Sequence, residues 1–123
     1  MRQLDRAEAV KVIVPIRLVS VANISEHWSK SAQRRREHRA ECWYSLKAAK
    51  IPHMLPCVVT LTRIAPRRLD AHDNLRSSAK GAVDGIADWL NLKTDADHRV
   101  EWRYAQRRGE PHEYALEIEV APQ

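Results

Sequence analysis

Two aspartates and an asparagine, Asp70, Asp73 and Asn74, stand where an expected strand gives way to an expected helix. One interpretation is helix capping, because an aspartate there accepts first-turn backbone N–H groups and offsets the positive end of the helix dipole, which contributes about 1 kcal/mol. The other is metal binding, since carboxylate oxygens are ligands that Mg²⁺ prefers. Taken alone, the pair favours capping.

A lysine and a further aspartate follow on the same expected helix. Lys80 lies about two helical turns beyond Asp73, and Asp84 lies about three, so the three side chains would share one face of a continuous helix. The apolar residues between 75 and 90 occupy a different face, which indicates a polar stripe beside a buried one. An ordinary i,i+4 ion pair with Lys80 is the alternative, and it is the better interpretation for Asp84.

A second acidic pair, Asp95 and Asp97, precedes the third expected strand. A loop there could return both carboxylates to the end of the sheet where Asp70 and Asp73 lie. Four carboxylates could then hold Mg²⁺, and paired divalent ions can orient a water nucleophile and neutralise the charge on a phosphodiester. Lys80 could stabilise the same developing charge. Most loop aspartates are instead solvated turn residues, and the spacing leaves both interpretations open.

Hydrophobic periodicity predicts the elements that would position these groups. The four expected strands are rich in β-branched residues or alternate in polarity, and they cover residues 10–21, 57–64, 100–104 and 114–120. Two helices are expected, a long polar one over 26–50 and one with an apolar stripe over 73–90. The order β-α-β-α-β-β predicts a single α/β (α+β) domain over residues 1–123, with a small mixed sheet and helices on one side.

Three expectations concern local packing. A hairpin is expected to join the last two strands through residues 107–112, which include a glycine and a proline. Gly81 and Gly85 should let another backbone pack closely against the second helix, and either this stripe or a strand edge could form a dimer interface. Trp43 and Trp102 lie at helical or alternating spacing, and we expect them to be buried.

The charge of the chain points to a polyanionic partner. The formal net charge is +5, and the first expected helix contains seven basic residues and three acidic ones. Consecutive arginines spread around a helix, so at least one should reach phosphate if DNA lies near, whereas a solvated helix with internal ion pairs is the alternative. Arg63, Arg67 and Arg68 lead into the acidic motif, where they would offset the repulsion between acids and phosphates. The candidate DNA-binding residues are Arg34, Arg35, Arg36, Arg39, Arg67 and Arg68.

Composition also excludes several classes. The longest uncharged stretch, residues 51–62, contains two prolines and is shorter than the roughly 18 residues of a membrane span. The N-terminus mixes charges and has no secretory signal pattern, so we expect a cytoplasmic protein. Cys42 and Cys57 have no metal-type spacing and should be half-buried thiols. No motif for reading bases directly is present, so recognition should depend on DNA shape and backbone.

In combination, these residues resemble the RusA-type Holliday junction resolvases and their phage-encoded relatives. The resemblance runs from about residue 12 to 120 and is strongest in four blocks: R-x-L-D-x-H-D-N-L from Arg67, K-x-x-x-D-G-I-A-D-W-L from Lys80, T-D-A-D from Thr94, and V-x-W-x-Y-A-Q from Val100. The arginine-rich helix and the Asn23 and His27-Trp28 positions before it look like the same family's N-terminal half.

The resemblance implies a homodimeric, Mg²⁺-dependent endodeoxyribonuclease that introduces paired nicks in four-way DNA junctions during recombination and repair, with Mn²⁺ able to substitute. It assigns metal binding to Asp70 and Asp73, the catalytic lysine to Lys80, and the third acid to Asp95 or Asp97. In this chain the first two acids are separated by two residues, where the family pattern is D-x-D-N, and Lys80 lies about one turn farther along. The alternatives are a non-catalytic branched-DNA-binding protein of the same fold and a protein-interaction module.

Overall fold

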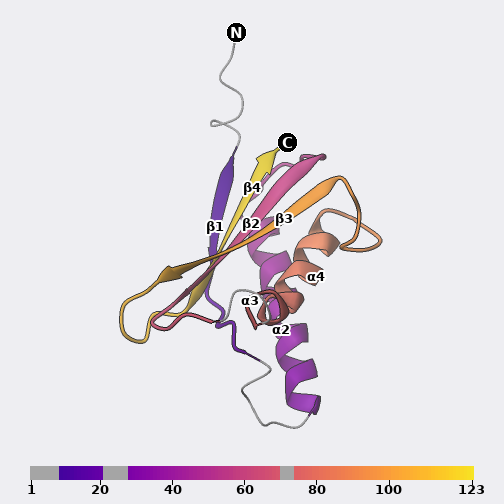
Figure 1. The fold of residues 1–123 in the computed structure, drawn as a ribbon. Helices are drawn as coiled ribbons and strands as arrows, with labels where there is room; N and C mark the ends of the chain where they lie inside the picture. The colour runs from indigo at the N-terminus through magenta and orange to yellow at the C-terminus, as the bar shows by residue number, and fades with distance from the viewer. Residues whose placement is uncertain (1–8, 21–27, 70–73) are drawn as a thin grey trace.

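The computed structural model describes residues 9–20, 28–69 and 74–123, which form a four-stranded sheet with three helices on one side of it (Figure 1). The elements in chain order are β1 (Val10–Val14), α2 (Trp28–Ala48), β2 (Cys57–Ala65), α3 (Asn74–Ser78), α4 (Lys80–Trp89), β3 (Val100–Arg108) and β4 (Ala115–Pro122). The α+β class, the mixed sheet and the placement of the helices are therefore as predicted. The first strand is shorter than expected because Pro15, which lacks an N–H, follows its last residue.

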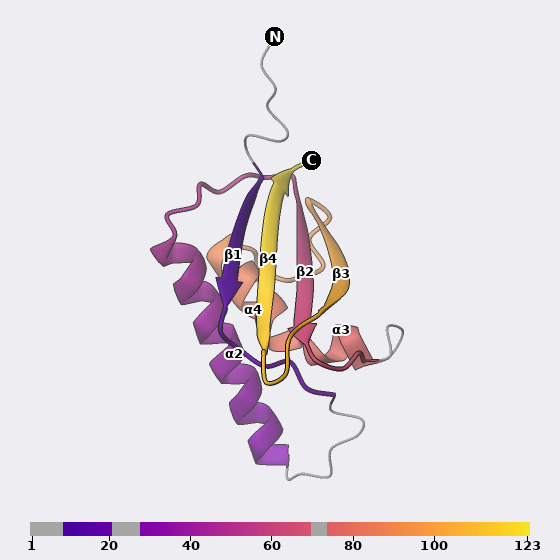
Figure 2. The same ribbon diagram turned by 90° about the vertical axis from the view of Figure 1, so that its left-hand side faces the viewer.

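The strands lie in the order β1-β4-β2-β3, as Figure 2 shows. Strands β2 and β3 are parallel, and β4 runs antiparallel to both β1 and β2. The predicted hairpin between the last two strands is therefore wrong, since β2 lies between them. The link after β3 crosses the end of β2 instead, where the Gly109 N–H donates a hydrogen bond of 2.9 Å to the Ala65 carbonyl. The helical crossover from β2 sets β3 parallel beside it, which leaves the other edge of β2 for β4.

The core lies between the sheet and the helices. Alternating side chains of the two central strands point into it, and the apolar stripe of α4 packs against them. Its fully buried members include Val59, Leu61, Ala82, Ile86, Leu116, Ile118 and Val120. Trp43 and Trp102, which we expected to be buried, are only partly covered at the rim of this core. No helix of the described residues is both long and apolar enough to cross a membrane.

Both cysteines lie deeper than the sequence suggested. Cys42 on α2 and Cys57 on β2 are fully buried as free thiols, where half-burial was expected. Burial raises the pKa of the Cys42 thiol to about 12, and it raises the pKa of Cys57 as well. A thiol that stays protonated is a weak nucleophile, so both cysteines act as small core residues.

Two glycines set the close approach of α4 to α2. A Cβ added at Gly81 would lie 2.6 Å from the Arg35 carbonyl oxygen, and one at Gly85 would lie closer still to the carbonyl oxygen of Arg39. The close backbone packing predicted for these glycines is therefore confirmed. Because α2 of the same chain covers them, the alternative that this stripe forms a dimer interface is wrong.

The helix predicted over 73–90 is divided at Ala79. This residue has φ −96° and ψ 3°, outside the helical region, and its N–H donates to the Arg76 carbonyl at 3.1 Å, which closes α3 with a tight turn. The Ser78 hydroxyl also donates to the Leu75 carbonyl, at 2.7 Å. The continuous helix that was expected to carry Asp73 and Lys80 on one face is therefore interrupted before Lys80. Within α4, Lys80 and Asp84 still share a face.

A buried histidine makes stability depend on pH. His38 on α2 is 7% exposed, and its pKa is lowered from the ordinary value of 6.5 by burial first and by Arg34 second, against the opposing effects of Glu37 and a hydrogen bond to the Arg17 backbone. The stability contributed by neutral His38 is thus fully present above about pH 6.5 and is lost as the pH falls toward its lower folded-state value. We expect the free energy of unfolding in urea to decline over this acidic range.

The matched variants are His38→Gln, which removes the titrating group and keeps a side-chain N–H, and His98→Gln, which alters an exposed histidine. The difference in unfolding free energy between pH 7.5 and 5.5 should shrink in the first variant and persist in the second. An equal pH dependence in His38→Gln and the unaltered protein would contradict this explanation.

Candidate functional site

A cleft of about 650 Å³ opens where the helices meet β3 and the loop before it. Its charged lining consists of Arg34 and Arg35 from α2, Arg76 from α3, Lys80 from α4 and Asp95 from the loop. Four cationic side chains and one anionic side chain make this a positively charged cleft, which suits a phosphate backbone. Its lining also includes the side chain of β3 residue Tyr104.

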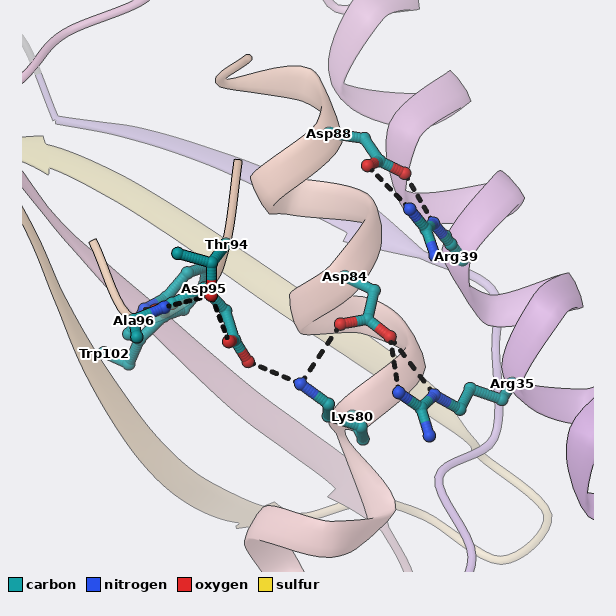
Figure 3. A network of polar contacts seen from close by, with 9 residues as sticks. All are labelled: Arg35, Arg39, Lys80, Asp84, Asp88, Thr94, Asp95, Ala96 and Trp102. Atoms are coloured by element: carbon teal, nitrogen blue, oxygen red, sulfur yellow. Dashed lines mark hydrogen bonds and ion pairs between the residues drawn. The ribbon is translucent and has the colours of Figure 1, made fainter. Parts of the chain in front are cut away.

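At the wall of the cleft, Lys80 lies between two carboxylates (Figure 3). Its Nζ is 2.5 Å from Asp95 Oδ2 and 3.2 Å from Asp84 Oδ1. The hydrogen bond to Asp95 is the main reason that the pKa of Lys80 is raised and the pKa of Asp95 is lowered. The lysine therefore stays an ammonium and Asp95 stays a carboxylate, and both charges are partly open to solvent.

The structure also accounts for the position of Asp95. Trp102 on β3 donates its indole N–H to the Asp95 carbonyl at 2.8 Å, and the Ala96 N–H donates to the Thr94 hydroxyl at 3.2 Å. Trp102 alternates with exposed charged residues along β3, so its side chain is on the helix side of the sheet and reaches this loop. We expected Trp102 to be buried, and its hydrogen bond to the loop was not predicted.

Asp97 makes different contacts from Asp95. Its carboxylate receives Arg99 Nε at 3.0 Å, Arg99 Nη2 at 2.8 Å and the Arg99 backbone N–H at 2.9 Å. This pairing holds the pKa of Asp97 well below its ordinary range. Asp97 does not line the cleft, whereas Asp95 does. Of the two residues considered for the third acid, the structure brings only Asp95 to Lys80.

Asp70, Asp73 and the intervening His72 lie outside the described residues, but the chain that leads to them is held by two side chains. Gln106 on β3 accepts from the Leu69 N–H and donates to the Leu69 carbonyl, both at 2.8 Å. Arg63, 7% exposed, donates to the Leu18 carbonyl at 3.1 Å and the Arg67 carbonyl at 2.6 Å. Arg63 thus has a structural role, because its buried guanidinium donates to two backbone carbonyls.

The two hydrogen bonds between the Gln106 side chain and the Leu69 backbone, here called the clamp, predict an effect of Gln106→Ala. Two hydrogen bonds are lost, so we expect a decrease in unfolding free energy of about 1–3 kcal/mol, at roughly 0.5–1.5 kcal/mol for each. The same change should speed hydrogen exchange at the Leu69 amide, because its acceptor is gone. Gln33→Ala is the matched control, since the Gln33 side chain donates to Glu37 on the exposed side of α2. Unchanged exchange at Leu69 in Gln106→Ala would rule out the clamp.

Two of the candidate DNA-binding arginines are held in ion pairs between helices. Arg35 donates from Nε and Nη2 to Asp84 Oδ2 at 3.1 and 3.0 Å, and Arg39 donates to the two oxygens of Asp88 at 2.6 and 2.8 Å. From the sequence, these arginines were expected to contact phosphate or, as the alternative, to form ion pairs within one solvated helix. The sequence could not anticipate the pairs between helices because they require α4 to lie against α2, which the two glycines permit.

The other candidate arginines differ in their relation to the cleft. Arg34 lines it, whereas Arg36, Arg67 and Arg68 are exposed and do not. Arg76 was not among the candidates, yet it lines the cleft with its guanidinium 5.3 Å from the centre of the Tyr104 ring. The signal that could have found it is its place directly after the D-N-L motif.

The Mg²⁺ implied by the resemblance needs several oxygen ligands. Within the described part of the chain, no group of three or more His, Cys, Asp or Glu side chains is arranged to hold a metal ion. Asp95, whose side chain is 33% exposed in the cleft, fits as one ligand. The other two implied ligands, Asp70 and Asp73, precede α3 in the sequence and lie outside the described residues. Helix α3 contributes Arg76 to the cleft. No model of a known protein family matches this chain, and no curated protein matches it.

Proposed function

We propose that this protein is a Mg²⁺-dependent endonuclease that acts as a homodimer on branched double-stranded DNA and resolves four-way junctions by paired nicks in recombination and repair. The observation that carries the proposal is the Lys80 ammonium, which is paired with Asp95 in a cleft lined by three arginines. This pair belongs to the sequence blocks that resemble the junction resolvases, and its position beside a basic cleft suits a reaction at phosphate.

In this proposal the phosphodiester backbone enters the cleft, where Arg34 and Arg76 contact phosphates. Lys80 donates hydrogen bonds to the reacting phosphate and stabilises the negative charge that builds up in the transition state. Asp70, Asp73 and Asp95 would hold Mg²⁺, which when bound supplies an activated water and neutralises phosphate charge. Shape and backbone contacts would select the branched substrate, and a two-fold dimer would match a junction with near two-fold symmetry.

A non-catalytic branched-DNA-binding protein is the second candidate. The observation that favours it is the pairing of Lys80 with both Asp84 and Asp95, because an ion-pair network of this kind can serve structure alone. The basic cleft would then hold DNA without cutting it.

The test compares a labelled four-way junction with a linear duplex of the same sequence, in Mg²⁺ and in EDTA. The proposal expects tighter binding of the junction in EDTA at low salt, and Mg²⁺-dependent cleavage of the junction that is lost in Asp95→Asn. Selective binding with no cleavage in Mg²⁺ or Mn²⁺ would overturn the nuclease and leave the second candidate. Equal, weak binding of both DNAs would contradict both functions.

A further inference from the structure

The carboxylate of Asp84 is the most enclosed of the four linked charged groups Asp95, Lys80, Asp84 and Arg35. Its side chain is 14% exposed, compared with 33% for Asp95 and 42% for Lys80. The sequence suggested that Asp84 makes an ordinary ion pair along a helix. The structure places it between two cations from different helices, in a row of alternating charges that runs from Asp95 through Lys80 and Asp84 to Arg35 (Figure 3).

The two oxygens of Asp84 are divided between these cations. Oδ1 lies 3.2 Å from Lys80 Nζ, and Oδ2 receives both Arg35 Nε and Arg35 Nη2. The paired donation from Arg35 anchors this second oxygen from α2, independently of Lys80. A lysine side chain has a flexible four-carbon stem with several rotatable bonds, so its ammonium stays in one place only if fixed partners hold it.

Asp95, the other partner of Lys80, is less able to provide a fixed position. It lies on a loop, it is more exposed, and under the proposed function its carboxylate is also a ligand for a divalent cation. A carboxylate oxygen that binds the cation makes a weaker ion pair with the Lys80 ammonium. The cation and the ammonium also repel each other. Asp84 faces no such competition, because Arg35 already occupies its second oxygen.

We propose that Asp84 is a positioning residue: anchored by Arg35, it holds the Lys80 ammonium in the cleft when Asp95 turns to a divalent cation. This inference rests on the proposed function, since it gives Asp84 its role in the same site. Asp84 itself contacts neither the phosphate nor the metal in this account. It acts through Lys80.

The chain contains a matched control for this role. Asp88 pairs with Arg39 one helical turn farther along the same two helices, again through a paired guanidinium contact. Asp84→Asn and Asp88→Asn therefore each weaken one pair between α2 and α4, but only the first removes a charge partner of Lys80. A merely structural role would make the two variants behave alike.

The first measurement is single-turnover cleavage of a four-way junction at increasing protein concentration, together with unfolding in urea. We expect Asp84→Asn to lower the maximal cleavage rate roughly tenfold to hundredfold, the scale of a misplaced catalytic group, with little change in the half-saturating concentration. Asp88→Asn should keep the cleavage rate within about twofold of the unaltered protein, while its loss of unfolding free energy should be similar to that of Asp84→Asn. Equal cleavage rates in the two variants at equal stability would overturn the proposal.

A second measurement does not need cleavage. The ¹⁵N-labelled ammonium of Lys80, assigned with Lys80→Arg, is followed by NMR while Mg²⁺ alone is added. We expect the signal to persist with Mg²⁺ in the unaltered protein and in Asp88→Asn, and to disappear in Asp84→Asn. A signal that persists equally in Asp84→Asn, or that is lost on Mg²⁺ addition in the unaltered protein, would overturn the role of Asp84. The unaltered protein and all its variants could fail to cleave the junction. An NMR signal that persists with Mg²⁺ in Asp88→Asn and disappears in Asp84→Asn would still support the role of Asp84, so failure of the nuclease and failure of the inference are distinguishable.

Discussion

Lys80→Met is expected to lower Mg²⁺-dependent cleavage of a four-way junction by about 10²–10³-fold, the usual effect of removing a donor that stabilises transition-state charge. Methionine keeps most of the apolar stem and removes the ammonium that lies 2.5 Å from Asp95 in the cleft. Binding of the junction in EDTA should weaken by only a few-fold, because the three arginines of the cleft are unchanged. The measurement is single-turnover cleavage beside a binding titration.

The control for this prediction is Lys93→Met, which alters an exposed lysine in the loop after α4. Removal of Lys80 also leaves Asp84 and Asp95 facing each other without the shared cation, so urea unfolding must show that the variant is folded. Lys80→Arg, which keeps the charge, provides a second variant. Cleavage by folded Lys80→Met at the rate of the unaltered protein would show that Lys80 does not take part in the reaction.

Gly85→Ala is expected to destabilise the fold, with a loss of unfolding free energy of about 1–3 kcal/mol or more from overpacking. An exposed helix interior would show the opposite sign, since alanine there is better than glycine by about 1 kcal/mol. The reversal follows from the position of the added methyl group, which would collide with the Arg39 carbonyl oxygen on α2. That atom belongs to helix backbone and can move only if the two helices separate.

The matched control is Gly109→Ala. The nearest atom to a Cβ there is Glu113 Oε1, at 2.9 Å, the far end of a flexible side chain that can turn aside with the loss of its hydrogen bond from the Glu110 N–H. Urea unfolding should therefore show a smaller loss for Gly109→Ala than for Gly85→Ala. A gain in stability for Gly85→Ala would contradict the close contact of α4 with α2.

Periodicity in the sequence was sufficient to predict where most helices and strands lie, but not how the strands pair. The alternation in residues 114–120 correctly predicted β4, yet nothing local to that segment indicates that it pairs with β2 instead of its neighbour in sequence. Pairing of strands depends on contacts across the whole sheet. In the same way, the apolar stripe of 73–90 continues through Ala79, so the break between α3 and α4 leaves no sign in the hydrophobic pattern.

The sequence predicted the charged residues of the candidate site, but it did not predict the side chains that hold its loops through hydrogen bonds to the backbone. Lys80 and Asp95 stand out as charged residues in a spaced motif, and the structure brings them together. Gln106 and Trp102 were missed as supports because each bonds the backbone of a loop residue, Leu69 and Asp95 respectively, and no sequence pattern records such contacts. The ion pair of Arg35 was missed because its partner, Asp84, lies on another helix.

The most direct test of the central claim is to map nicks on a four-way junction labelled in each of its four strands in turn. With Mg²⁺, we expect two nicks placed symmetrically about the branch point on opposite strands. With EDTA, or in Asp73→Asn, we expect none. Mn²⁺ should support the same pattern. A protein that binds the junction selectively yet leaves all four strands intact in both metals, or one whose nicks survive in Asp73→Asn, would contradict the proposed nuclease.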